Sequence, residues 1–98
     1  MLSWMTDLAD RVLNVLKKLR DPVSGAPALF IDSVVDVQDL GDGVVRITLM
    51  CKDPHSPNII TYAEAAKTLA SRCEGVKKVV IEVRNHVLAD FVNLKLNL

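Results

Sequence analysis

Residues 35–51 constrain the fold of this chain more than any other segment. Val35 and Val37 alternate with polar residues, and a second alternating run follows the tetrapeptide Leu40-Gly41-Asp42-Gly43. Alternation with period two is typical of a strand that buries one face, and glycines allow the positive φ angles of a tight turn. The sequence therefore predicts an antiparallel hairpin whose first strand starts near Ile31. The buried face of its second strand should carry Val45, Ile47, Leu49 and Cys51. The exposed face should carry Val44, Arg46, Thr48 and Met50.

Helical periodicity flanks the predicted hairpin on both sides. Residues 7–19 carry apolar side chains along one helical stripe, and Pro22 stops the helix. A second helix is predicted to start with Ser56 as its N-cap and Pro57 at its first position, and to end before Gly75. Thr61 and Glu64 form a rival capping box, but helical spacing already runs from the earlier start. Within this helix, Cys73 falls at a buried spacing.

Two further strands follow. Residues 76–84 alternate at Val79, Ile81 and Val83, and residues 91–98 alternate more weakly at Val92, Leu94, Leu96 and Leu98. A length of 98 residues suits one domain. We therefore expect a single α+β domain over residues 1–98 in the order α-β-β-α-β-β, with a small, mostly antiparallel or mixed sheet and two helices on one face.

Composition narrows the function classes. Twelve Lys+Arg balance twelve Asp+Glu, and aromatic residues make up 4% of the chain, so we expect neither nucleic acid nor a membrane surface as partner. Neither a targeting signal nor an apolar stretch of the roughly 18–20 residues that span a bilayer is evident. Cys51 and Cys73 are too few for a disulfide framework, which favours a cytoplasmic location.

The predicted topology brings three loops to one pole of the sheet, namely residues 21–28, 52–57 and 85–88. Polar and metal-capable side chains gather in these segments: Asp21, Cys51, Asp53, His55, Ser56 and His86. Cys73 should lie at the opposite pole, because the intervening helix rises about 1.5 Å per residue and separates the two cysteines by roughly 25 Å. The two thiols are therefore not expected to share a metal.

Cys51 and His55 form a Cys-x3-His pair, for which His86 or Asp53 offers a third zinc or iron ligand. The alternative reading makes Cys51 a buried core residue and leaves both histidines exposed on loops. Known catalytic motifs are missing, so we expect no enzyme activity. A mononuclear metal hydrolase that uses Cys51, His55 and His86 is a third interpretation.

Three segments, in this order and spacing, resemble the iron–sulfur cluster assembly (FSCA) domain family, in particular its PaaD-like and SufT-like members. These are Val15 to Pro22, Ile31 to Val37, and Gly75-Val76-Lys77-Lys78-Val79. Val45 to Leu49 is also similar to the family's strand before its Cys-Pro loop, and the likeness extends over residues 12–83. The family's reactive cysteine before proline is replaced here by Ser56 before Pro57.

The resemblance implies an accessory role in iron–sulfur cluster assembly or metalloprotein maturation, with assembly proteins or a client metalloenzyme as partners. Binding would occur at the pole formed by Asp21, Pro22, Asp53, Ser56 and Pro57, and Cys51 would be the thiolate for a transient cluster or metal ion. The alternative is a cluster-free interaction or homo-oligomerisation module on the same fold. Such a module would use the sheet face turned away from the helices, with Val34, Val44, Met50 and Val80.

Overall fold

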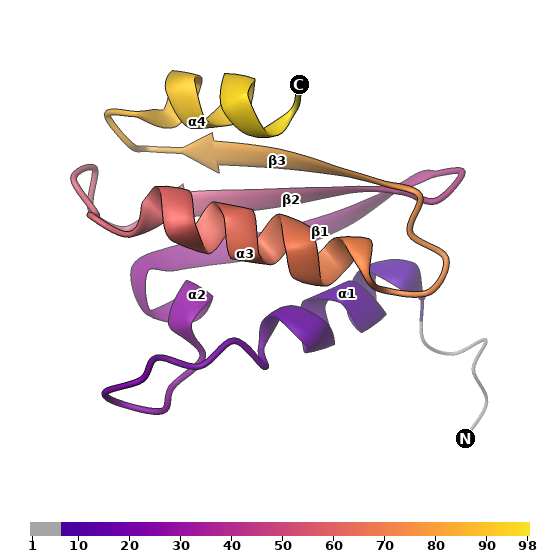
Figure 1. The fold of residues 1–98 in the computed structure, drawn as a ribbon, viewed down its shortest axis with the longest axis horizontal. Coiled ribbons are helices and arrows are strands. Elements are labelled where there is room, and N and C mark those ends of the chain that lie inside the picture. The colour runs from indigo at the N-terminus through magenta and orange to yellow at the C-terminus, as the bar shows by residue number, and fades with distance from the viewer. Residues whose placement is uncertain (1–6) are drawn as a thin grey trace.

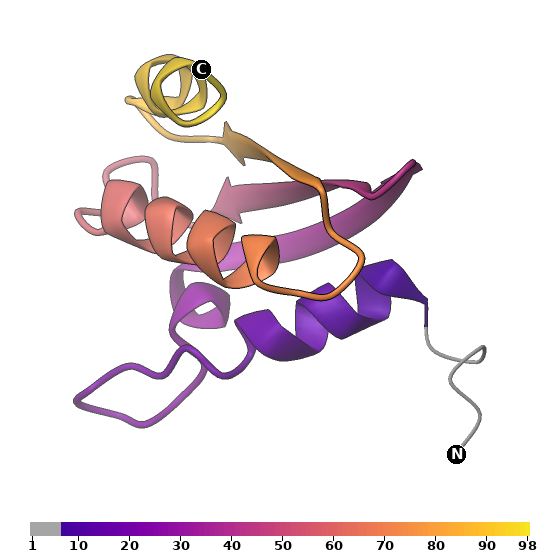
Figure 2. The same cartoon turned by 45° about the vertical axis from the view of Figure 1, so that its right-hand side comes forward.

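The computed structural model describes residues 7–98 and contains one three-stranded mixed sheet (Figure 1). β1 (Ser33–Gly41) pairs antiparallel with β2 (Val44–Cys51), and β3 (Lys78–Arg84) pairs parallel with β2 on its other side. α1 (Leu8–Leu16) and α3 (Ile59–Ser71) cover the same face of the sheet, as Figure 2 shows from the side. The predicted α+β class is confirmed.

The hairpin turn forms as the glycines predict. Gly41, Asp42 and Gly43 have φ angles of 92°, 56° and 80°. A Cβ atom on Gly43 would lie 2.8 Å from the carbonyl oxygen of Gly75, so only glycine fits this close approach. The turn is therefore packed against the segment that leads into β3, where the Gly43 carbonyl accepts a hydrogen bond from the Lys77 backbone N–H at 2.8 Å.

The core lies between the sheet and the two helices. The inward side chains of β2 are at most 1% exposed, as the alternation predicts: Val45, Ile47, Leu49 and Cys51. Val12 and Leu16 of α1 are fully buried against them. α3 contributes three fully buried alanines, Ala63, Ala66 and Ala70, whose small side chains allow its backbone to approach the sheet closely.

Several element boundaries differ from the sequence prediction. Ile31 belongs to the short helix α2 (Ala28–Asp32), which leads directly into β1, so the predicted early start of the first strand is wrong. α1 ends at Leu16, three residues before the predicted end. α3 starts at Ile59 with Asn58 at its N-cap position, because Ser56 is buried before the helix rather than capping it.

The predicted fourth strand is wrong. Residues 89–96 form the helix α4 (Ala89–Leu96), which runs alongside β3 at the edge of the sheet (Figure 1). Val92 and Leu96, which are four residues apart, are buried, whereas Leu94 and Leu98 are 67% and 94% exposed. The period-two run of the sequence therefore divides between opposite faces of a helix.

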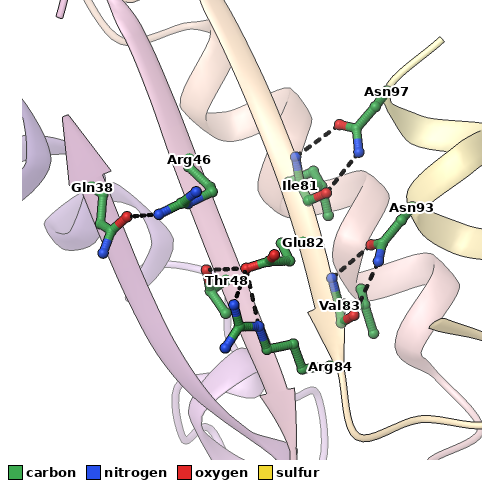
Figure 3. A network of polar contacts seen from close by, with 9 residues as sticks. All are labelled: Gln38, Arg46, Thr48, Ile81, Glu82, Val83, Arg84, Asn93 and Asn97. Atoms are coloured by element: carbon green, nitrogen blue, oxygen red, sulfur yellow. Dashed lines mark hydrogen bonds and ion pairs between the residues drawn. The ribbon is translucent and has the colours of Figure 1, made fainter. Parts of the chain in front are cut away.

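Asn93 of α4 and Asn97, the C-cap residue of this helix, pair with the outer edge of β3 (Figure 3). Asn93 accepts from the Val83 backbone N–H at 2.7 Å and donates to the Val83 carbonyl at 3.1 Å. Asn97 makes the same two contacts with Ile81, at 2.9 and 2.8 Å. We call these four bonds the amide clamp.

The amide clamp works because two spacings agree. Residues four apart on a helix are separated by about 6 Å along its axis, and residues two apart on a strand by about 6.6 Å. The side-chain amides of Asn93 and Asn97 therefore meet alternate residues of β3 and take the place of a neighbouring strand. No helix in residues 7–98 is long and apolar enough to cross a membrane.

We expect Asn93→Ala and Asn97→Ala each to lower the free energy of unfolding by about 1–3 kcal/mol, because each leaves a backbone N–H and C=O of β3 without partners. Urea unfolding of the purified variants measures this difference. Asn14→Ala on the exposed side of α1 is the matched control and should change stability by less than about 0.5 kcal/mol. Equal effects of all three substitutions would contradict a role for the clamp.

Candidate functional site

The structure brings two of the three predicted loops into direct contact at one pole. The Val87 backbone N–H donates to the Pro54 carbonyl at 3.0 Å, and the Asn85 side chain donates to the Cys51 carbonyl at 2.7 Å. Asn85 has a φ angle of 57°, which an asparagine tolerates better than most residues. Loops 52–57 and 85–88 therefore form one connected surface.

The third loop, residues 21–28, lies at the same end of the molecule but is organised internally (Figure 1). The Asp21 carboxylate accepts from the backbone N–H groups of Ser24 and Val23 at 2.7 and 3.2 Å. The hydrogen bonds from Ser24, its backbone N–H first, hold the pKa of Asp21 below its ordinary value. Asp21 and Pro22 thus shape their own turn, and the side chain of Asp21 is committed to it.

Cys51 sits at the end of β2 and is 1% exposed. Burial raises the pKa of its thiol; a hydrogen bond with Ser33 offsets part of this, and the nearby carboxylates of Asp32 and Asp53 raise the pKa further. The thiol therefore stays protonated at neutral pH. A thiolate is the form that binds metals and attacks electrophiles, so this environment disfavours both.

Both ring nitrogens of His86 are engaged. Nδ1 accepts from the Leu88 backbone N–H at 3.0 Å, which leaves the proton on Nε2 to donate to the Ser56 carbonyl at 2.8 Å. His86 consequently fastens loop 85–88 to the segment before α3. As a metal ligand, it would have to give up one of these bonds.

His55 and Asp53 occupy the exposed part of loop 52–57. The Asp53 carboxylate accepts from the His55 backbone N–H at 2.9 Å, so the pair stabilises the turn. Within residues 7–98, no three His, Cys, Asp or Glu side chains lie close enough together to hold a metal ion. The described conformation thus does not assemble Cys51, His55 and His86 into a three-ligand centre.

Ser56 is 5% exposed, and its hydroxyl oxygen has no hydrogen-bond partner among the described residues. Pro57 follows it and separates it from α3, whose N-cap residue Asn58 makes no side-chain capping bond. The serine therefore serves as a buried anchor through its carbonyl, which His86 contacts, rather than as a helix cap.

Cys73, at the other pole, is half-buried beyond the end of α3, where its sulfur lies 3.7 Å from the Leu69 carbonyl oxygen.

A second surface was missed by the sequence interpretation because it lies on the helix predicted as a strand. Phe91 and Leu94 project from α4 on the side opposite the buried Val92 and Leu96, and Val87 and Leu98 flank the helix at its two ends. These four apolar residues are exposed: Val87, Phe91, Leu94 and Leu98, at 62%, 56%, 67% and 94%. We call these four residues the α4 stripe. Their spacing of four, three and four residues is the sequence signal for a helical face, of which α4 itself contains Phe91 and Leu94.

The open face of the sheet carries both apolar and polar side chains. Val34 and Met50 are 60% and 42% exposed, whereas Val44 and Val80 are half-buried. A polar network crosses this face (Figure 3), in which Thr48 and Arg84 both contact the Glu82 carboxylate, at 3.3 and 3.1 Å. Nearer the hairpin turn, Arg46 donates to the Gln38 side chain.

The fold and these surfaces define a small α+β domain with a helix-capped mixed sheet. The sequence matches no known family profile. It is 33% identical over 82 residues to uncharacterized protein MJ1129 of Methanocaldococcus jannaschii, an alignment that covers 84% of this chain and 86% of that protein. The chain belongs to the same family as this archaeal protein.

We expect Cys51 to react slowly with iodoacetamide in the folded protein, because its thiol is buried and its pKa is raised. The measurement compares Cys73→Ser, which leaves Cys51, with Cys51→Ala, which leaves the half-buried Cys73. At a pH of about 7.5, Cys51 should be alkylated at least about tenfold more slowly than Cys73. Similar rates in the folded variants, together with similar rates in urea, would contradict the assignment.

Proposed function

We propose that this chain is a non-enzymatic protein-interaction module that pairs with a second copy of itself through the α4 stripe. The observation that supports this proposal is the position of the stripe. The amide clamp fixes one side of α4 to the sheet, and the opposite side presents large apolar side chains to solvent. Exposed apolar patches of this kind are typical of interaction sites.

The pattern of the helix favours a second copy as the partner. In sequence, Val87, Phe91, Leu94 and Leu98 follow the alternating four and three spacing of the apolar seam in a coiled coil, and the central two lie within α4. In a parallel pair, each copy's Asp90 would lie beside the other copy's Lys95, five residues further on, which are opposite charges. Apolar seam and charged flanks are therefore both self-complementary.

Within one copy, Lys95 lies 3.6 Å from Glu64 of α3, and both side chains are about half exposed. An exposed pair of this kind contributes at most about 1 kcal/mol and leaves Lys95 able to reorient. α4 has only eight residues, about two helical turns, and association costs at least about 4 kcal/mol of lost freedom. We therefore expect a weak, reversible dimer.

Light scattering across a range of protein concentrations tests the proposal. The wild-type mass should rise towards that of a dimer at high concentration, and Phe91→Asp should remain monomeric because it places a charge in the apolar seam. Val23→Asp is the matched control, since Val23 is 94% exposed on loop 21–28, away from α4. A wild-type protein that stays monomeric at millimolar concentration would contradict self-association.

Charge reversal refines this test. Asp90→Lys should weaken the dimer, and the double variant Asp90→Lys with Lys95→Asp should regain at least part of the loss if the copies pair in parallel. If the double variant regains no dimer, the copies do not pair in parallel. The Phe91→Asp variant still tests whether the α4 stripe mediates association.

An accessory role in iron–sulfur cluster assembly, through binding of assembly proteins or a client metalloenzyme, is the second proposal. Its support is the resemblance to FSCA domains together with the gathering of Cys51, Ser56 and His86 at one pole. A cluster at Cys51 would require the buried thiol to become exposed and ionised. The first proposal predicts that anaerobically reconstituted protein is colourless, whereas thiolate-to-iron absorbance that disappears in Cys51→Ala would favour the second.

A further inference from the structure

The two edges of the sheet differ in whether their outward backbone groups have hydrogen-bond partners, a difference that plays no part in the proposed self-association. At the β3 edge, the amide clamp occupies the outward backbone groups of Ile81 and Val83. At the β1 edge, no helix or loop of residues 7–98 donates to or accepts from the outward backbone groups of Val35 and Val37. The described part of the chain therefore has one satisfied edge and one free edge.

The direction of the free groups follows from the strand register. The Asp32 backbone carbonyl accepts from the Lys52 backbone N–H at 2.8 Å, which starts the ladder between the first two strands. Antiparallel pairing alternates residues that bond to the neighbouring strand with residues that point away from it. Even-numbered residues of β1 therefore bond to β2, and Val35, Val37 and Asp39 direct their N–H and C=O groups outward.

β1 is also long and accessible enough to receive another strand. It spans nine residues, and most of its side chains are exposed or half-buried. Val34 and Leu40, near its two ends, are 60% and 50% exposed and supply apolar contact beyond the backbone. An extended segment of similar length can add to such an edge through main-chain hydrogen bonds.

Charge specifies what kind of segment fits. Between Arg20 and Arg46 the chain contains no Lys or Arg but five aspartates: Asp21, Asp32, Asp36, Asp39 and Asp42. Asp36 and Asp39 lie on β1 itself, and neither forms an ion pair within residues 7–98. Like charges disfavour a second copy of β1 along this edge. Asp36 pairs with Thr48 on the open face, where Lys or Arg side chains at alternate positions of an added strand would meet its carboxylate.

We infer that the β1 edge binds an extended segment of a partner protein that carries Lys or Arg at alternate positions, and that this segment adds to the sheet as a fourth strand. Main-chain bonds to Val35, Val37 and Asp39 supply the register, and Asp36, on the open face, selects basic partners. Charged residues on an edge strand can also act only to prevent edge-to-edge aggregation. In that case neither a basic nor an acidic extended peptide would bind to β1.

Amide hydrogen exchange followed by NMR tests the inference on the full chain. The probe is a blocked peptide that alternates lysine and valine over the length of β1, and the matched control peptide has glutamate in place of lysine. The lysine peptide should slow exchange at the Val35, Val37 and Asp39 amides at least about tenfold. Val34, Asp36 and Gln38 should change little, because their amides already bond to β2.

Two variants separate backbone pairing from charge attraction. Val37→Pro removes an outward N–H without removing a bond to β2, so it should weaken binding of the lysine peptide. Asp36→Asn combined with Asp39→Asn should weaken binding at least about tenfold at low salt and should keep the fold. Asp10→Asn on α1 is the control that leaves binding unchanged.

Three outcomes would overturn the inference. The first is no slowing at the outward amides of β1 at millimolar lysine peptide, and the second is equal slowing by the glutamate peptide. The third is binding of the lysine peptide confined to α4 or to the loops of the pole. Because the readout is confined to β1, its failure is distinct from a failure of self-association through α4.

Discussion

The pairing of two asparagine side chains with the edge of β3 is the interaction on which the rest of this structure depends. A small sheet has two edges, and each edge exposes backbone groups that attract other strands. The amide clamp satisfies one edge with a helix instead of a further strand. It also determines which side of α4 is buried, because Asn93 and Asn97 must face the sheet together with Val92 and Leu96.

The orientation of α4 places its remaining apolar residues in solvent. With one side held by four hydrogen bonds, the helix cannot rotate to bury Phe91 and Leu94 without breaking the clamp. The α4 stripe and the free edge of β1 therefore both follow from the way the two sheet edges are satisfied. One edge of the sheet is covered by a helix that presents an apolar face, and the other edge presents backbone groups among aspartates.

The polar pole has a different character. Its histidine, serine and cysteine are used to connect loops: His86 bonds to the Ser56 carbonyl, and Asn85 bonds to the Cys51 carbonyl. These contacts give structural roles to residues that the spacing alone offered as metal ligands. Burial of the Cys51 side chain, which raises the pKa of its thiol, follows from its inward position at the end of β2.

Local patterns in the sequence predicted the hairpin well. The glycines of the turn and the alternation of Val45, Ile47 and Leu49 both specify an antiparallel hairpin. The three alternating side chains are buried in the core as this pattern predicts. The meeting of loops 52–57 and 85–88 was also predictable, because a strand that returns after one helix must end beside its parallel neighbour. The confirmed α+β class follows from these elements.

The C-terminal segment was not predictable in the same way. The apolar residues of this segment alternate with a period of two, as in a strand. The same residues also fit two opposite faces of a helix: Val92 and Leu96 on one, and Leu94 and Leu98 on the other. Only contacts with β3, some ten to sixteen residues away in sequence, decide between them through Asn93 and Asn97. The start of α3 was misplaced for a related reason, since burial of Ser56 against loop 85–88 removed it from its capping role.

Amide hydrogen exchange of the unliganded protein tests the central claim, the difference between the two sheet edges, most directly. We predict strong protection of the Ile81 and Val83 amides, which the clamp occupies, and fast exchange of the Val35 and Val37 amides, which have no partner within residues 7–98. Equally fast exchange at all four positions would contradict the clamp, and equally strong protection would contradict the free edge of β1.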